Sequence, residues 1–125
     1  MRPSDVPPLL GIARKAGKVV AGQEAVEKAV LSKKVYLVII AEDASSNTKD
    51  KFTTICKSRG INCIIYGTSE VLGKCIGKPA RKIIGITDKN FSKEIWKRLY
   101  ATKTTEVRNI VKSESVRTSQ KTGNI

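Results

Sequence analysis

The chain has 125 residues, of which 40% are hydrophobic, and its 24 Lys and Arg against 11 Asp and Glu give a formal net charge of +13. This length and apolar content predict one folded domain with its own core and exclude a wholly disordered chain. The excess of positive charge falls mostly within the first 100 residues and favours a polyanionic partner.

The first half of the chain predicts two helices, a short extended piece and a buried strand. The proline pair at 7–8 suits the first turn of a helix that Gly17 ends, and Lys18–Ala21 is expected to be extended. In the run Gly22–Asp43, GQEAVEKAVLSKKVYLVIIAED, a glycine opens a short amphipathic helix. The β-branched run Val35–Ala41 is typical of a strand covered on both faces.

The second half predicts three more helices and two strands from caps before helices and glycine or proline after them. In chain order these are a helix between Ser45–Asn47 and Gly60, a strand at Ile61–Tyr66, a helix from Thr68 or Ser69 to Gly77, a strand at Lys82–Thr87 and a helix capped by Asp88. The alternation of helices and strands predicts an α/β fold in which a small sheet lies between helices.

The last part of the chain is polar. Residues 1–103 are expected to form the domain, and residues 104–125, rich in Ser, Thr and Lys, a mobile basic tail. A last helix that continues through Val107, Ile110 and Val111 is the alternative.

The cysteines and the lack of long apolar stretches indicate the cellular compartment. Cys56, Cys63 and Cys75 are odd in number and scattered, which favours buried thiols in a reducing compartment. No stretch has the apolar length of a signal peptide or a membrane span. We therefore expect a cytoplasmic protein without membrane association.

No catalytic constellation is visible in the sequence. The chain has no histidine, which excludes Ser-His-Asp and Cys-His sites and removes the commonest metal ligand. Its glycines match neither of the nucleotide-binding patterns G-x-x-x-x-G-K-[ST] and G-x-G-x-x-G. Glu42, Asp43 and Asp88 are expected to cap helices rather than bind a metal. The prediction is a protein that is not an enzyme and has no cofactor or metal.

Two segments are candidates for binding. Lys28 lies one helical turn after Glu24, so the two side chains either form a solvated ion pair or contact exposed bases, with helix N–H groups near a phosphate. The segment Ile76–Lys82 mixes apolar and basic residues between a helix and a strand. It either packs on an unstacked base or is a tight turn whose Ile76 reaches the core. Further lysines near the first segment favour RNA, namely Lys15, Lys18, Lys33 and Lys34.

Three blocks in this order resemble the kink-turn RNA-binding ribosomal protein superfamily. They are Gly22-x-Glu24-x-x-x-Lys28-Ala29-Val30, Val38-Ile39-Ile40-Ala41-Glu42-Asp43-Ala44 and Leu72-Gly73-Lys74-x-x-Gly77. The stretches LGIARKAGKVVAG, AEDASSNTK and IGITDKNF are similar to its bacterial YlxQ-like branch. The resemblance covers about residues 7–100.

The resemblance implies a three-layer α/β/α sandwich with a four-stranded mixed sheet, and a site for a bent duplex with tandem sheared G·A pairs. Gly22 and Lys28 match the helix-opening glycine and the lysine of the family. Glu24 stands where members carry Asn, and Ala25 where they carry Glu. Together, residue types and resemblance predict an RNA site made of Lys18, Gly22, Gln23, Glu24, Lys28, Lys33, Ser45, Ile76, Lys78, Arg81 and Lys82.

The expected protein is therefore a monomeric RNA-binding protein associated with the ribosome or another ribonucleoprotein. It would recognise structured RNA by shape, unstacked bases and phosphate contacts. The alternatives are a protein-interaction module that docks on an acidic partner, or an accessory subunit of an RNA-processing complex.

Overall fold

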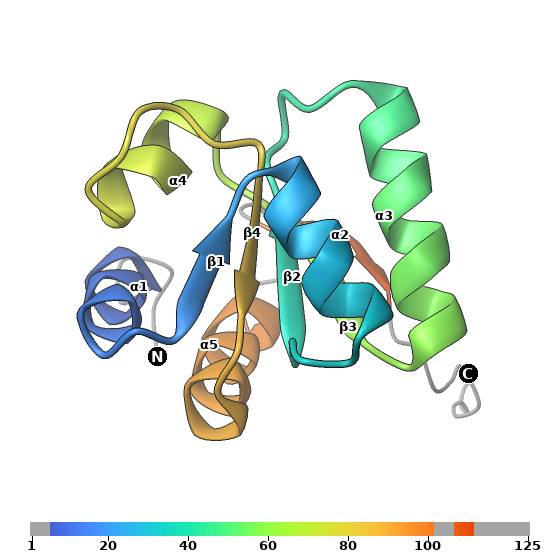
Figure 1. Ribbon diagram of the computed structural model, residues 1–125. Helices are drawn as coiled ribbons and strands as arrows, with labels where there is room; N and C mark the ends of the chain where they lie inside the picture. Colours follow the sequence, from blue (N-terminus) through green and yellow to red (C-terminus); the bar gives the residue numbers. More distant parts are fainter. Residues whose placement is uncertain (1–5, 102–106, 112–125) are drawn as a thin grey trace.

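The computed structural model describes residues 6–101 and 107–111. Along the chain, helices and strands alternate (Figure 1). The helices are α1 (Val6–Lys15), α2 (Gln23–Leu31), α3 (Ser46–Arg59), α4 (Ser69–Cys75) and α5 (Lys89–Ala101). The strands are β1 (Val19–Ala21), β2 (Leu37–Ile40), β3 (Asn62–Tyr66), β4 (Ile83–Ile86) and β5 (Val107–Val111).

The strands form one mixed sheet in the order β1-β4-β2-β3-β5. Strands β2 and β3 are parallel, with Leu37 opposite Asn62, whereas β4 runs antiparallel to both of its neighbours, β1 and β2. Strand β5 adds to the free edge of β3 in antiparallel orientation. The expected three-layer α/β/α sandwich with a mixed sheet is confirmed, with β1 to β4 as the four expected strands.

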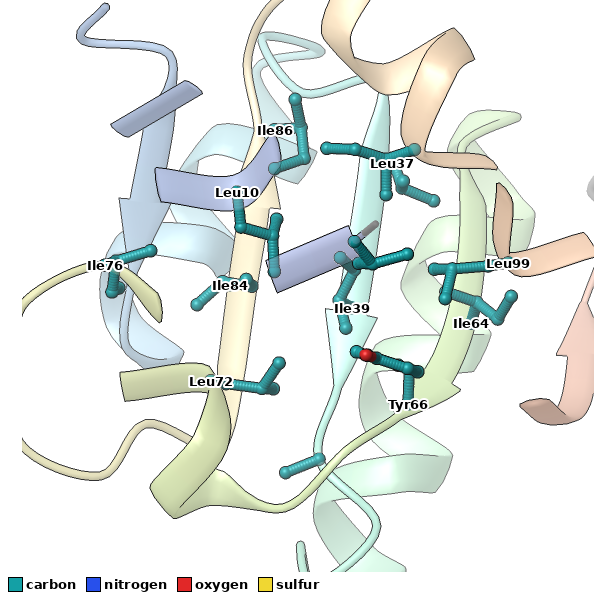
Figure 2. Packing of buried hydrophobic residues seen from close by; sticks show 13 residues of the cluster. Leu10, Leu37, Ile39, Ile64, Tyr66, Leu72, Ile76, Ile84, Ile86 and Leu99 are labelled. Carbon is teal, nitrogen blue, oxygen red and sulfur yellow. The ribbon is translucent and has the colours of Figure 1, made fainter. Parts of the chain in front are cut away.

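Two apolar cores hold the layers together, one on each face of the sheet. On one face, α1, α4 and α5 contribute Leu10, Leu72 and Leu99, which surround strand residues such as Ile39 (Figure 2). On the other face, α2 and α3 contribute buried Val and Phe side chains. Every residue of β2 and β4 is buried, as the β-branched run of β2 predicts for a strand covered on both sides.

The helix ends follow from local sequence signals. Ser45 accepts a hydrogen bond from the backbone N–H of Thr48 and begins α3. Gly60 ends the same helix in the left-handed conformation, at φ 73°. The carboxylate of Asp88 accepts from the backbone N–H of Phe91 at 2.9 Å and begins α5. These caps agree with the sequence-based predictions.

Strand β5 lies inside the segment expected to be a polar tail. For residues 107–111, the structure replaces both the mobile tail and the alternative helix with an edge strand that pairs with β3. The backbone hydrogen bonds that β3 offers at its free edge explain this pairing, and a polar sequence does not prevent it. The rest of the predicted tail, residues 104–106 and 112–125, lies outside the described residues.

None of the three cysteines forms a disulfide, and all of them are buried or half-buried. Burial raises the pKa of the Cys75 thiol, and a hydrogen bond with Cys56 together with burial raises that of Cys63. These thiols are thus apolar packing groups, as expected. The described ranges contain no cluster of three or more His, Cys, Asp or Glu suited to a metal ion, and none of their helices is long and apolar enough to cross a membrane.

Candidate nucleic-acid interface

The strand directions bring several loops to one end of the sheet, the upper end in Figure 1. Strands β1, β2 and β3 all finish there and β4 begins there, because Ala21 pairs with Ile84 and Ile40 with Ile83. The upper end therefore collects the first turns of α2, α3 and α4 and the loop between α4 and β4. Both segments singled out in the sequence lie at this end.

Helix α2 begins at the upper end without a side-chain cap. Its N-cap residue is Gly22, at φ 96°, whose own N–H donates to the carbonyl of Ile83 at the start of β4. The first hydrogen bond within the helix runs from Val26 to Gly22, so the N–H groups of residues 23–25 have no intrahelical acceptor. Helices α3, α4 and α5 each have a side-chain cap. The first turn of α2 is thus a free set of donors for phosphate or base acceptors.

Glu24 and Lys28 lie one turn apart on α2, and both are exposed. Within the described residues no ion pair joins them, so the solvated pair considered from the sequence is not formed. Because side chains on a helix lean toward its N-terminus, Lys28 extends toward the uncapped turn. The charged groups of both residues are available to a ligand at the upper end.

The loop from 76 to 82 lies at the same end and is held against α4 by backbone hydrogen bonds. The N–H of Lys78 donates to the carbonyl of Gly73, and that of Arg81 to the carbonyl of Ser69. A Cβ at Gly73 would lie 2.1 Å from the carbonyl oxygen of Pro79, so only glycine permits this approach. Lys78 and Lys82 remain exposed on the fixed loop.

Asp43 joins two of these loops, a role that sequence analysis missed. Its carboxylate accepts from both the N–H and the hydroxyl of Ser69, at 2.7 and 2.6 Å, and its carbonyl oxygen lies 3.5 Å from the amine of Lys82. The hydrogen bonds from Ser69 hold the pKa of Asp43 below its usual value. The predicted cap is real, but Asp43 caps α4 rather than the helix that follows it in sequence.

The remaining predicted contacts fall into three groups. Lys18 directly precedes β1 and Lys33 follows α2, so both lie at the lower end of the sheet, away from the upper loops. Ile76 is 1% exposed and packs in the core, so the tight turn is the correct interpretation and base contact by this side chain is not (Figure 2). Ser45 is at the upper end, but its hydroxyl is engaged in capping α3.

Arg81 is half-buried and has a structural part in the loop. Its guanidinium donates to the carbonyls of Ala80 and Pro79, at 3.1 and 3.4 Å. Gly22 is at the upper end too, but its N–H and carbonyl are both bonded within the fold. The predicted residues that the upper end brings together with exposed side chains are Gln23, Glu24, Lys28, Lys78 and Lys82.

Comparison with known proteins identifies the family of the chain. The sequence profile of the Ribosomal protein L7Ae/L30e/S12e/Gadd45 family matches residues 5–96. The chain belongs to this family. It is 40% identical over 88 residues to the RNA-binding protein YlxQ of Bacillus subtilis (strain 168), covering 70% of this chain and 88% of that protein. It is 35% identical over 86 residues to YlxQ of Enterococcus faecium, covering 69% and 82%. These matches place it in the YlxQ-like branch of the L7Ae/L30e/S12e/Gadd45 family.

Solved structures share the fold of this chain. A protein of unknown function from Bacillus halodurans superimposes with a TM-score of 0.70 at 39% identity, over 71% of this chain and 90% of that one. The 15.5kD RNA binding protein of Giardia lamblia superimposes with a TM-score of 0.69 at 21% identity, over 78% and 87%. At that lower identity, the likeness concerns the fold alone.

Proposed function

We propose that this chain is a non-catalytic, cytoplasmic RNA-binding protein that associates with the ribosome as a monomer and recognises a structured, kink-turn-like RNA with its upper end. The observation that carries the proposal is the uncapped first turn of α2 beside exposed Lys28, at the same sheet end as the loop that presents Lys78 and Lys82. The relatives in the YlxQ-like branch are named RNA-binding proteins, which supports the same partner.

The chemistry of the upper end suits a bent RNA duplex better than an extended strand recognised by its base sequence. Free N–H groups of α2 donate to phosphate or base oxygens, and the two loop lysines attract the backbone of a second strand segment. Glu24 is able to accept from the N–H groups of a guanine edge, with Lys28 limiting the cost of its charge near phosphate. Recognition would depend on the shape that brings these groups of the RNA together.

The test is a gel-shift titration of the full chain at two salt concentrations. It compares a kink-turn RNA with the same duplex lacking its G·A pairs. A preference for the kink-turn that persists as salt rises is the expected result. Equal binding of both RNAs that collapses with salt would leave only phosphate attraction and contradict kink-turn recognition.

A matched pair of variants locates the site. Lys28→Ala should weaken kink-turn binding by about 1–3 kcal/mol if Lys28 contacts a base edge. Lys33→Ala removes the same charge at the lower end of the sheet and should leave the affinity nearly unchanged. Equal losses in the two variants would contradict the assignment of the upper end.

A further inference from the structure

A pocket lies at the lower end of the sheet, opposite the upper end that is proposed to bind RNA. It is a cavity of about 350 Å³ between the loop before β2, the start of β3 and the first turns of α5. We refer to it as the lower pocket. The lining side chains that matter for its chemistry are Tyr36, Asn62, Lys89, Ser92, Lys93 and Trp96.

The topology explains why these residues meet. Strands β2 and β3 are parallel neighbours that both begin at the lower end, which places Tyr36 near Asn62, the residue opposite Leu37. On α5, residues 89, 92, 93 and 96 follow the spacing of a single helix face. That face closes the pocket against the two strand beginnings.

The pocket combines aromatic surface with positive charge. Tyr36 is 47% exposed although it is a large apolar side chain, and Trp96 is half-buried with its ring stacked on Tyr100. Lys89 and Lys93 are exposed, and the described lining contains no carboxylate. An exposed aromatic residue beside lysines is the composition of surfaces that bind single-stranded nucleic acid.

Polar groups in the pocket have unused hydrogen-bonding capacity. Ser92 is only 7% exposed, and its hydroxyl has no hydrogen-bond partner in the part of the chain that the structure describes. The same holds there for the side-chain amide of Asn62. The hydroxyl of Ser92 still contacts solvent, so it and the amide of Asn62 are available to form hydrogen bonds with a ligand in the pocket.

We propose that the lower pocket binds one unpaired nucleotide of an RNA strand. Its base packs on the rings of Tyr36 and Trp96 and takes hydrogen bonds from Asn62 and Ser92, while Lys89 and Lys93 meet the flanking phosphates. The volume falls in the range of small-molecule sites. The pocket is a second RNA contact, separate from the upper end, and it does not depend on recognition of a kink-turn there.

The single tryptophan of the chain, Trp96, reports directly on this pocket. Titration of the full chain with a short oligoadenylate, which has no duplex, should quench its fluorescence and give a dissociation constant. Tyr36→Ala should weaken that binding about tenfold, the effect of losing one stacking ring. Leu31→Ala, at a residue that is 45% exposed and outside the pocket, is the matched control and should have no effect.

A second pair of variants tests the charge. Lys93→Gln should weaken oligoadenylate binding several-fold, whereas Lys97→Gln, one turn further along α5 and outside the lining, should not. Lys28→Ala at the upper end should leave the quenching unchanged, so a failure of the proposed kink-turn recognition and a failure of the lower pocket give different results.

Four outcomes would overturn the proposal. The first is no quenching by oligoadenylate. The second is equal quenching by tripolyphosphate, which carries charge but no base. The third is equal quenching by polyglutamate, which would indicate an acidic protein segment as the occupant. Quenching that Tyr36→Ala and its control reduce equally would also contradict base stacking in the pocket.

Discussion

Two glycines inside helices, Gly11 of α1 and Gly73 of α4, have opposite surroundings. A Cβ at Gly11 would lie 3.4 Å from the nearest atom outside its own helix, the carbonyl oxygen of Cys75, whereas at Gly73 it would lie 2.1 Å from the carbonyl oxygen of Pro79. Alanine favours a helix over glycine by about 1 kcal/mol at either position. At Gly73 the obstacle is backbone, so the helix gain is outweighed.

Gly73→Ala is therefore expected to lower the free energy of unfolding by about 1–3 kcal/mol, the usual cost of overpacking, because the loop from 77 to 80 must move. Gly11→Ala should be neutral or slightly stabilising. Urea unfolding of both variants measures the difference. A stabilised Gly73→Ala variant would show that the loop is not held against α4.

At the scale of elements, Asp43 fastens the first turn of α4 to the loop after β2 through its hydrogen bonds from Ser69. Asp43→Ala leaves the N–H of Ser69 without this acceptor and should cost about 1–2 kcal/mol of stability at neutral pH. Because Lys82 lies beside Asp43 and Arg81 bonds to Ser69, the loop should loosen and kink-turn affinity should fall as well.

The same interaction gives a pH dependence of known sign. The folded-state pKa of Asp43 is lowered, so its stabilisation is present above the pKa of about 3.9 of an unfolded aspartate and is lost as pH falls through the folded value. The wild-type chain and Asp43→Ala should differ in urea unfolding at pH 7 and converge at lower pH, below about 4. Asp50→Ala, whose carboxylate has no partner among the described residues, should show no such convergence. A constant difference at all pH values would place the effect elsewhere.

The elements that sequence analysis predicted correctly depend on neighbours in the chain. The cap of Ser45 spans three residues, and the buried run before Glu42 needs only its own composition. The contact between Asp43 and Ser69 spans 26 residues and exists only because β2 and β3 are parallel neighbours. Pairing across the sheet likewise decides where β5 lies and which lysines lie at the same end of the sheet. No local sequence pattern contains this information.

At the scale of the whole molecule, the sheet separates two surfaces of different chemistry. The upper end presents backbone donors and lysines from two loops, whereas the lower end presents aromatic rings and lysines around a pocket. The residues Lys18 and Lys33, which sequence proximity grouped with the Gly22 segment, belong to the lower end. Within the part of the chain that the structure describes, exposed lysines thus lie at both ends of the sheet rather than at one.

This distribution predicts how salt acts on binding. For a kink-turn RNA without single-stranded ends, which only the upper end should contact, the logarithm of affinity falls linearly with the logarithm of salt concentration. Each phosphate contact contributes about 0.9 to the slope in duplex nucleic acid, so replacing Lys78 and Lys82 by Gln should reduce the slope by about 2. Replacing Lys33 and Lys34 by Gln removes the same charge from the lower end and should leave the slope unchanged. Equal reductions in both double variants would mean that the RNA responds to the total charge of the chain and does not sit at the upper end.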